Sequence, residues 1–504
     1  MTAEDRSAAA PAARAAPTTR GAFVLLALFL AYAAWIASAR EVDFDFWYHM
    51  AEGKRIVETH RLAFHDTFSH TAAGQPYPPA EWLFQVMIYG FHAALGEAGI
   101  VLYKTLFVTA WGVVLVAAAR RRGARLETAV AVAALALLAA LNRFMARPEW
   151  VTFLGLALVA AHVYDEEEGR AGPRRRALLI AAILVWANAH PGVFFGVGML
   201  WVWAMASAIA SVRAAARGEI RPAHRAPALL ALASTAAAFA TPAGVGTLTF
   251  FLHHADVFRR LRVEEFQPLP FVPELGFIWL YIGLAGILFL LRRRDQTPFQ
   301  RFAIPIFFLF AVRNARLVPL FIGVTAPLVP LWLERAVPAL VARHALAGGL
   351  ALAALASCAA YRVVETPRWG PIALSVDEQQ VPRRAADFLD ANGVRDPLYN
   401  FQGYGSYLLW RGFRVSTDAR LPLYAEIIPQ FQQRPFETIN RFGLNVAVVP
   451  SPESPNAAFD PIATGLLKRR NVWAPVHRDD VAMVFLRRGA GHDGVIAERE
   501  LGVP

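Results

Sequence analysis

The sequence predicts a polytopic α-helical membrane protein with about eleven transmembrane helices and a C-terminal α/β domain outside the cytoplasm. Hydrophobic residues make up 56% of the 504 residues, whereas soluble domains contain roughly 45–50%. They gather in nearly uncharged runs of roughly twenty residues, long enough to cross a bilayer core. Arginines cluster between these runs, so the net charge of +11 reflects membrane topology and argues against nucleic acid as a partner.

Each apolar run predicts one transmembrane helix. Residues 1–20, rich in Ala, Pro and Thr, predict a disordered cytoplasmic N-terminus, and residues 21–363 the transmembrane domain. The first run shows no obvious small-residue cleavage site, which favours a retained helix over a signal peptide. The single cysteine, Cys358, excludes a disulfide framework and a thiolate metal site. The predicted helices cover residues 21–38, 99–119, 126–141, 150–164, 177–189, 193–212, 226–252, 274–291, 299–312, 317–333 and 345–361.

The basic loops decide how the further apolar run at 82–95 is interpreted. Short loops rich in Lys and Arg stay in the cytoplasm. If residues 82–95 crossed the membrane, the arginines at 120–125 would lie outside; if they lie in the interface, every basic cluster lies inside. We therefore expect an interfacial or re-entrant helix at 82–95. The protein is then a multi-pass inner-membrane protein with a cytoplasmic N-terminus and a periplasmic C-terminal domain.

This topology gathers polar residues at the external side of the membrane. Ionisable groups at membrane depth are costly and usually functional. Their convergence therefore indicates a site. The residues are Asp43, Asp45, His49, Asp66, Glu81, Arg143, Arg147, Glu149, His190, Glu264, Glu265, Arg313 and Arg316.

The first external loop, residues 41–98, supplies the acidic candidates. Asp43 and Asp45 are spaced to offer two carboxylate oxygens to Mg²⁺ or Mn²⁺, and either residue is a candidate general base. The alternative is that they cap the short helix expected from residue 46 to about residue 59. His49, on that helix, is a candidate acceptor contact.

Two further acidic positions follow in the same loop. His65 and Asp66 either add metal ligands or form a solvated turn. Glu81 either starts the interfacial helix, where the helix dipole favours an acid, or is a second catalytic carboxylate facing Asp45.

Several segments of this chain together resemble a bacterial branch of the GT-C superfamily of membrane glycosyltransferases. They are DFDFWYHMAEGKRIVETH at 43–60, HDTFSHTAAGQPYPPAEWL at 65–83, WANAHPGVFFG at 186–196, RNAR at 313–316, and YNFQGYGSYLLW with STDAR at 399–420. The resemblance implies a polyprenyl-phosphate-linked sugar donor, an inverting transfer at the outer face, and an acidic residue of the first loop as base or metal ligand.

The resemblance offers two assignments for that acid. Asp45, with the aromatic pair after it, looks similar to the loop aspartate of oligosaccharyltransferase catalytic subunits, and Asp43 to the acidic position of the protein-mannosyltransferase-like branch. This sequence departs from the motifs of both branches, which counts against carrying either assignment over directly. Phe44 follows Asp43, so the Asp-Glu pair of the mannosyltransferase branch is absent. The W-W-D motif of oligosaccharyltransferases is not found in the C-terminal part.

Four arginines at span ends are candidates for binding the donor phosphate, because guanidinium groups bind phosphate in a bidentate fork. Arg143 and Arg147 bracket one external turn, where the alternative is snorkelling at a helix end. Arg313 and Arg316 lie in another, where the alternative is pairing with Glu264 or Glu265.

Two external loops complete the predicted site. His190 lies in a tight turn with Pro191 and Gly192. It either orients an acceptor hydroxyl, binds a metal ion, or is structural. The longer loop at 253–274 is a candidate gate over the lipid site.

Residues 364–504 are polar and predict the periplasmic α/β domain. A helix is expected at 381–391, ended by Gly393. A Gly-Tyr-Gly spacing at 403–405 lacks the third glycine of a dinucleotide fingerprint, and we expect no nucleotide cofactor. Asp418 and Arg420 either contact acceptor sugars or form a structural ion pair. The predicted strands are 397–401, 413–416, 445–449, 472–476 and 482–486.

The favoured hypothesis is therefore a membrane glycosyltransferase that acts on a glycan, lipid or protein acceptor. A lipid-linked saccharide transporter or flippase is the first alternative, but it would be expected to show internal repeats and midplane charges. A non-catalytic membrane assembly protein is the second. Substitution of the loop aspartates distinguishes it from an enzyme.

Overall fold

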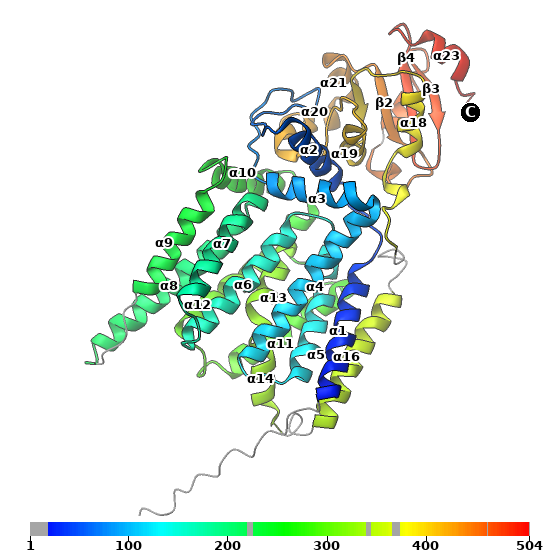
Figure 1. Ribbon diagram of the computed structural model, residues 1–504. Coiled ribbons are helices and arrows are strands. Elements are labelled where there is room, and N and C mark those ends of the chain that lie inside the picture. Colours follow the sequence, from blue (N-terminus) through cyan, green and yellow to red (C-terminus); the bar gives the residue numbers. More distant parts are fainter. Residues whose placement is uncertain (1–18, 219–224, 339–343, 365–372, 461, 503–504) are drawn as a thin grey trace, which may run out of the picture.

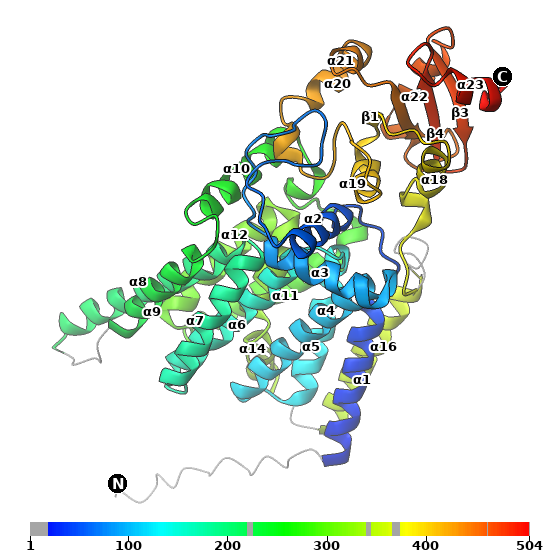
Figure 2. The ribbon, with the colours of Figure 1, turned by 45° about the horizontal axis from the view of Figure 1, so that its top comes forward.

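The structure, a computed structural model, describes residues 19–218, 225–338, 344–364, 373–460 and 462–502. A bundle of long helices carries a small sheet domain at one end (Figure 1). We refer to this end of the bundle as the domain-side end. Helices α2 (Phe46–Thr59), α3 (Trp82–Leu95) and α10 (Gly246–Arg260) lie between the bundle and the sheet domain (Figure 2).

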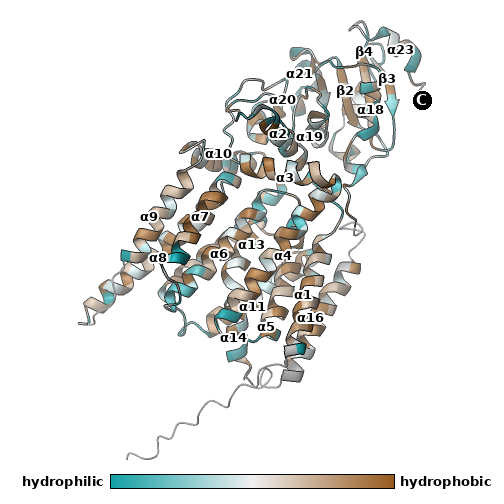
Figure 3. Ribbon diagram, in the orientation of Figure 1, coloured by the Kyte–Doolittle hydropathy of each residue, from teal (hydrophilic) through white to brown (hydrophobic). Residues whose placement is uncertain are grey.

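The bundle has the composition of a polytopic membrane fold (Figure 3). Four described helices are long and apolar enough to cross a membrane, or five if one bent pair counts as a span. Four shorter apolar helices accompany them, and the full count of eleven spans stays a prediction. The helices of the bundle are α1 (Thr19–Ala37), α4 (Glu97–Arg121), α5 (Leu126–Ala139), α6 (Glu149–Glu167), α7 (Pro173–Ala189), α8 (Val193–Ala215), α9 (Arg225–Phe239), α11 (Gly276–Leu291), α12 (Pro298–Arg313), α13 (Val318–Thr325), α14 (Val329–Ala336) and α16 (His344–Val364).

Two predicted spans are not continuous helices. The run at 226–252 is divided between α9 and α10, so its assignment as one span is wrong. Between the two helices, the Thr241 hydroxyl accepts a hydrogen bond from the Gly244 amide at 3.1 Å, and Gly244 adopts φ +53°, which a tight turn accommodates in glycine. The run at 317–333 is divided between α13 and α14, which are bent by 63°.

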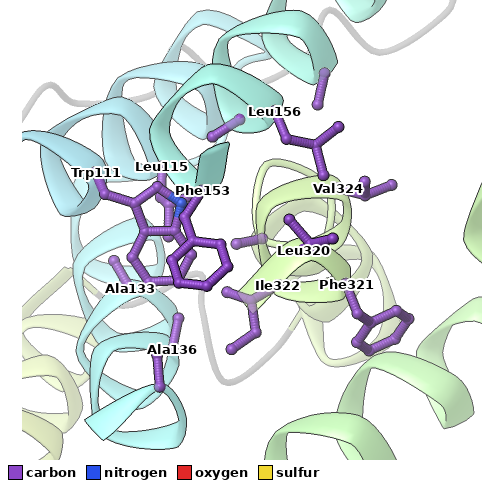
Figure 4. Packing of buried hydrophobic residues seen from close by; sticks show 14 of the residues in the cluster. Trp111, Leu115, Ala133, Ala136, Phe153, Leu156, Leu320, Phe321, Ile322 and Val324 are labelled. Carbon is purple, nitrogen blue, oxygen red and sulfur yellow. The ribbon is translucent and has the colours of Figure 1, made fainter. Parts of the chain in front are cut away.

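The core of the bundle packs aromatic rings against small residues. Trp111 of α4 lies against Trp150 of α6 with ring centroids 5.9 Å apart. Ala133 and Ala136 of α5 are buried next to this pair, with the apolar side chains of α13 opposite (Figure 4). Because alanine lets neighbouring helices approach closely, these contacts hold the helix ends, and thus the loops between them, in fixed positions.

The basic loops gather at the end of the bundle away from the sheet domain. The Arg121 guanidinium lies 2.6 Å from Asp165, and Arg122 lies 2.7 Å from Glu168. The Arg125 amide donates to Glu334 at 2.7 Å, which ties the α4–α5 loop to the end of α14. The α4–α5 loop, the end of α6 and the end of α14 therefore share one side, as the assignment of their basic clusters to the cytoplasm requires.

Helices α2 and α3 form a platform over the domain-side end, and α3 has the bounds predicted for the interfacial helix. On its other face, α2 contacts the sheet domain through the Trp47 ring, whose centroid lies 4.9 Å from that of Tyr407. The two platform helices approach closely at Gly53. A Cβ atom there would lie 2.0 Å from the backbone oxygen of Gln85.

We expect Gly53→Ala to destabilise the platform, since the added methyl group meets backbone and forces the helices apart. Overpacking of this kind costs about 1–3 kcal/mol, which thermal unfolding of the purified protein measures as a lower midpoint. Gly90→Ala is the matched control on α3, because a Cβ there meets nothing within 4 Å. Equal midpoints for both variants would contradict the close approach.

The C-terminal domain contains a four-stranded mixed sheet in the order β1-β2-β4-β3. β1 pairs parallel with β2, and the other pairs are antiparallel. Four predicted strands and the helix at 381–391 are confirmed within a few residues. The strands are β1 (Leu398–Asn400), β2 (Val446–Pro450), β3 (Trp473–Arg478) and β4 (Ala482–Arg487), and the helices are α18 (Arg383–Ala391), α19 (Gln402–Trp410), α20 (Ile428–Gln433), α21 (Pro435–Arg441), α22 (Ile462–Leu467) and α23 (Asp493–Arg499).

The predicted strand at 413–416 is wrong. Only one isolated bridge, from Val415 to Leu398, joins this segment to the sheet in the described residues. The Asn400 side chain accepts a hydrogen bond from the Ser416 amide at 3.0 Å and donates to the Thr417 carbonyl at 2.8 Å. These side-chain bonds replace a ladder and turn the segment toward the bundle.

Candidate active site

A buried ion pair fastens the start of the first loop. The Lys104 ammonium lies 3.0 Å from the Glu41 carboxylate, and both side chains are buried. Glu41 also accepts hydrogen bonds from the amides of Asp43 and Ala146, each at 3.0 Å. The sequence analysis missed this pair, although a lone lysine inside the apolar run 99–119 was the available signal. The pair sets segment 41–45 against the turn before α6.

Arg147, in that turn, binds both loop aspartates. Its guanidinium donates to the two carboxylate oxygens of Asp43 at 3.0 and 2.7 Å and lies 3.0 Å from Asp45 Oδ2. Its third nitrogen donates to Glu265 at 2.9 Å. The acidic loop and a predicted phosphate-binding arginine therefore meet at one point.

Two further arginines join the same network. Arg143 binds Glu149 through two nitrogens and donates to Glu265 Oε2 at 2.5 Å. Arg316 donates to Glu149 at 2.5 Å and to Glu265 Oε1 at 2.9 Å. Three guanidinium groups thus surround one carboxylate. Arg316 pairs with Glu265 in this structure, and its binding of a phosphate stays a prediction.

Arg313 is not part of this network. Asn314, at the C-terminal end of α12, has φ −150° and ψ 107°, and the chain changes direction there. Arg313 is left exposed, whereas Arg316 is directed inward. Arg313 therefore lies apart from the other three arginines, and its assignment as a phosphate contact stays a prediction.

A cavity of about 870 Å³ opens beside the arginines. Its polar wall includes Asp45, Arg143, Arg147 and Arg316, and its rim includes Gln402 of the sheet domain. The polar wall also includes Arg40 and the acidic residues Glu264, Glu265 and Glu274. The apolar part of the lining includes Val42, Phe44, Leu141, Phe144, Phe258, Pro268, Pro270, Val272 and Leu275. An apolar wall next to a group of guanidinium donors suits an amphiphilic anion that can take the place of their present carboxylate partners.

The two loop aspartates differ in access and in charge. The Asp45 side chain is 23% exposed and lines the cavity. The Asp43 side chain is 2% exposed, with both oxygens held by Arg147. Burial raises the pKa of Asp45 to about 7, although the Arg147 charge opposes the rise. A reachable carboxyl with this pKa suits proton transfer near neutral pH.

Glu81 does not cap α3 through its side chain; its carboxyl lies 3.6 Å from His190 Nε2. Burial raises the pKa of Glu81 to about 8 and lowers that of His190 to about 3. His190 Nδ1 accepts from the Gly192 amide at 3.1 Å and lies 2.6 Å from the Thr152 hydroxyl. The ring proton is therefore assigned to Nε2, which faces Glu81.

The four predicted metal ligands are not brought together. Asp66 binds Arg420 at 2.6 Å and caps the turn at Ser69, while His65 is exposed. The described residues contain no group of three or more His, Cys, Asp or Glu side chains placed to hold a metal ion. The predicted set of Asp43, Asp45, His65 and Asp66 therefore does not fit a cation in this arrangement, and metal dependence stays a prediction.

Asp418 and Arg420 form a buried structural pair, which corrects their assignment as acceptor contacts. Two Arg420 nitrogens donate to the Asp418 carboxylate at 2.9 and 2.6 Å, and the Tyr424 hydroxyl donates to it at 2.6 Å. Both residues are at most 3% exposed. Although burial opposes it, Arg420 holds the pKa of Asp418 below its usual value.

His49 is also buried and thus out of reach of an acceptor. Its ring packs edge-on against Phe84 with centroids 4.8 Å apart, and the side chain is enclosed by the platform helices. The predicted contact of His49 with an acceptor is therefore not what the structure shows.

The fold, rather than the sequence, relates this chain to known proteins. Neither a protein-family model nor a curated protein matches the sequence. The archaeal oligosaccharyltransferase AglB from Archaeoglobus fulgidus, solved with an inhibitory peptide and a dolichol-phosphate, is similar with a TM-score of 0.60 at 13% identity, over 85% of this chain and 69% of AglB. ArnT from Cupriavidus metallidurans, solved with undecaprenyl phosphate, gives 0.56 at 15% identity, over 94% of this chain and 99% of ArnT. The chain therefore shares the fold of AglB and ArnT over most of its length.

Proposed function

We propose that this protein is an inverting glycosyltransferase that moves a sugar from a polyprenyl-phosphate-linked donor to an acceptor on the periplasmic face. One observation carries the proposal: three guanidinium groups and the reachable Asp45 carboxyl share one cavity whose other wall is apolar. The cavity is lined by residues just before α2, by the turn before α6 and by Gln402 of the sheet domain, which all belong to the domain-side end. The positive-inside tendency supports a location of the cavity outside the cytoplasm.

In this proposal, the donor lies with its lipid along the apolar wall and its phosphate toward the arginines. AglB and ArnT were solved with lipid phosphates, which supports this class of ligand. Guanidinium groups in a site of low dielectric stabilise charge that develops during the reaction. Departure of the lipid phosphate develops such charge.

Asp45 is the proposed general base. The acceptor hydroxyl oxygen forms a bond to the anomeric carbon, the bond from that carbon to the phosphate oxygen breaks, and the hydroxyl proton passes to Asp45. The lipid phosphodiester, with one negative charge, leaves as a phosphomonoester with two. The charge lost by Asp45 thus appears on the phosphate, beside the three arginines. Asp43 positions Arg147 through its bidentate contact, and a single displacement inverts the anomeric centre.

The pH profile tests the role of Asp45. A base works only when deprotonated, so activity should be low below the pKa and rise through pH of about 7. The assay follows release of undecaprenyl phosphate from a panel of undecaprenyl-phosphate hexoses by the protein in liposomes, with membrane extract as acceptor. A rate that falls or stays flat across this range would contradict Asp45 as the base.

A further inference from the structure

Glu265 occupies the centre of the proposed phosphate site. Its Oε1 atom accepts from Arg147 and Arg316, each at 2.9 Å, and Oε2 accepts from Arg143 at 2.5 Å. Although burial alone would raise it, these three cations hold the pKa of Glu265 well below its usual range. The carboxylate is therefore ionised, and it uses the same donors that a phosphate would use.

The segment that carries Glu265 is a loop with an anchored far end. α10 ends at Arg260, and Arg262 adopts φ +53°, a strained conformation for a residue other than glycine. Beyond Glu265, the Gln267 carbonyl accepts a hydrogen bond from the Ala315 amide at 3.2 Å, and the Leu269 amide donates to the Val312 carbonyl at 3.0 Å. Between these two points the described contacts of Glu265 itself are with arginines of the site. Its carboxylate thus holds the loop over the cavity.

A neighbouring contact completes the closure. The Arg316 guanidinium lies 5.0 Å from the centroid of the Phe266 ring, which packs on Phe258 at 4.7 Å. Arg316 is therefore held by Glu265 on one side and by the next residue of the same loop on the other. Movement of the loop would release both contacts together.

We propose that Glu265 is an internal anion that fills the donor phosphate site and makes donor access depend on a phosphate group. The inference rests on the proposed function. A lipid phosphate can bind the three guanidinium groups only when it displaces the Glu265 carboxylate. An uncharged lipid cannot replace the ion pairs that this displacement would break. Glu265 is thus a specificity-determining residue: the apolar wall accepts a long lipid, and the carboxylate selects one that carries a phosphate.

The test measures binding to the full-length protein in detergent. The apparent Kd equals the intrinsic Kd divided by the fraction of molecules whose site is open. If the wild-type site is open about a tenth of the time, Glu265→Gln should bind undecaprenyl phosphate about tenfold more tightly. Undecaprenol should bind the variant and the wild type equally. Glu264→Gln is the matched control. Glu264 also lines the cavity but is exposed, and its substitution removes the same charge from the same loop while the three ion pairs of Glu265 stay in place.

Hydrogen exchange provides the second measurement. Residues 261–268 should exchange faster in Glu265→Gln than in Glu264→Gln, while protection of the bundle helices stays unchanged. Equal or weaker binding of undecaprenyl phosphate by Glu265→Gln, beside clear binding by the wild type, would overturn this inference alone. Absence of undecaprenyl phosphate binding by the wild type and the variant alike would overturn the proposed function as well.

Discussion

Replacement of Asp45 by asparagine should lower kcat/KM for sugar transfer by roughly 10²–10⁴-fold, the usual contribution of a general base. The amide keeps the shape of the side chain but cannot accept the hydroxyl proton. Donor binding should persist, because Asp43 still holds Arg147 at 2.7 and 3.0 Å. The measurement is release of undecaprenyl phosphate from the lipid-linked sugar at saturating acceptor.

Glu81→Gln is the matched control for this loss. Burial raises the pKa of Glu81 to about 8, so this carboxyl is mostly protonated at pH 7 and an amide resembles it. The activity of the Glu81→Gln variant at pH 7 should stay near that of the wild type, although the sequence makes Glu81 a candidate catalytic carboxylate. Wild-type turnover by the Asp45 variant, or a comparable loss in the Glu81 variant, would contradict the assignment of roles.

Arg420→Met should strongly destabilise the junction between the first loop and the sheet domain. Arg420 binds Asp66 of the loop and Asp418 of the domain, each at 2.6 Å. Its guanidinium also lies 5.3 Å from the centroid of the Tyr48 ring. Removing the cation leaves two buried carboxylates without their partner, and breaking a buried pair in this way costs about 3–5 kcal/mol. Thermal unfolding of the purified protein measures the loss as a lower midpoint.

The comparison variant is Arg434→Met, which removes an ion pair at the surface of the same domain. Arg434 and Glu437 are 3.6 Å apart, with side chains 73% and 74% exposed. Exposed pairs of this kind contribute about 0–1 kcal/mol, so this variant should unfold near the wild-type temperature. Equal drops in the unfolding midpoint of Arg420→Met and Arg434→Met would contradict the role of Arg420 in joining the first loop to the sheet domain.

The sequence predicts the end of the bundle at which the site lies better than it predicts which residues form the site. Basic loops report which span ends share a side, so Arg143, Arg147 and Arg316 were correctly grouped with the loop aspartates. Spacing could not distinguish Arg313 from Arg316, because the change of direction at Asn314 depends on its backbone angles. Nor could it separate Asp43 from Asp45, whose difference in access follows from the hydrogen bonds of Glu41.

Long-range pairing explains the other errors. Asp66 and Arg420 are 354 positions apart, and no local pattern connects them. Each therefore looked like a free polar side chain near the membrane. The division of the run at 226–252 is a different case, because Pro242 and Gly244 were visible in the sequence but were outweighed by the apolar residues around them.

The most direct test of this account is an experimental structure of the protein with undecaprenyl phosphate bound. The account predicts the phosphate within hydrogen-bond distance, about 3 Å, of at least two of Arg143, Arg147 and Arg316, with the lipid along the apolar wall of the cavity and Asp45 open to the acceptor side. A phosphate bound outside this cavity, with the three arginines still engaged only by carboxylates, would contradict it.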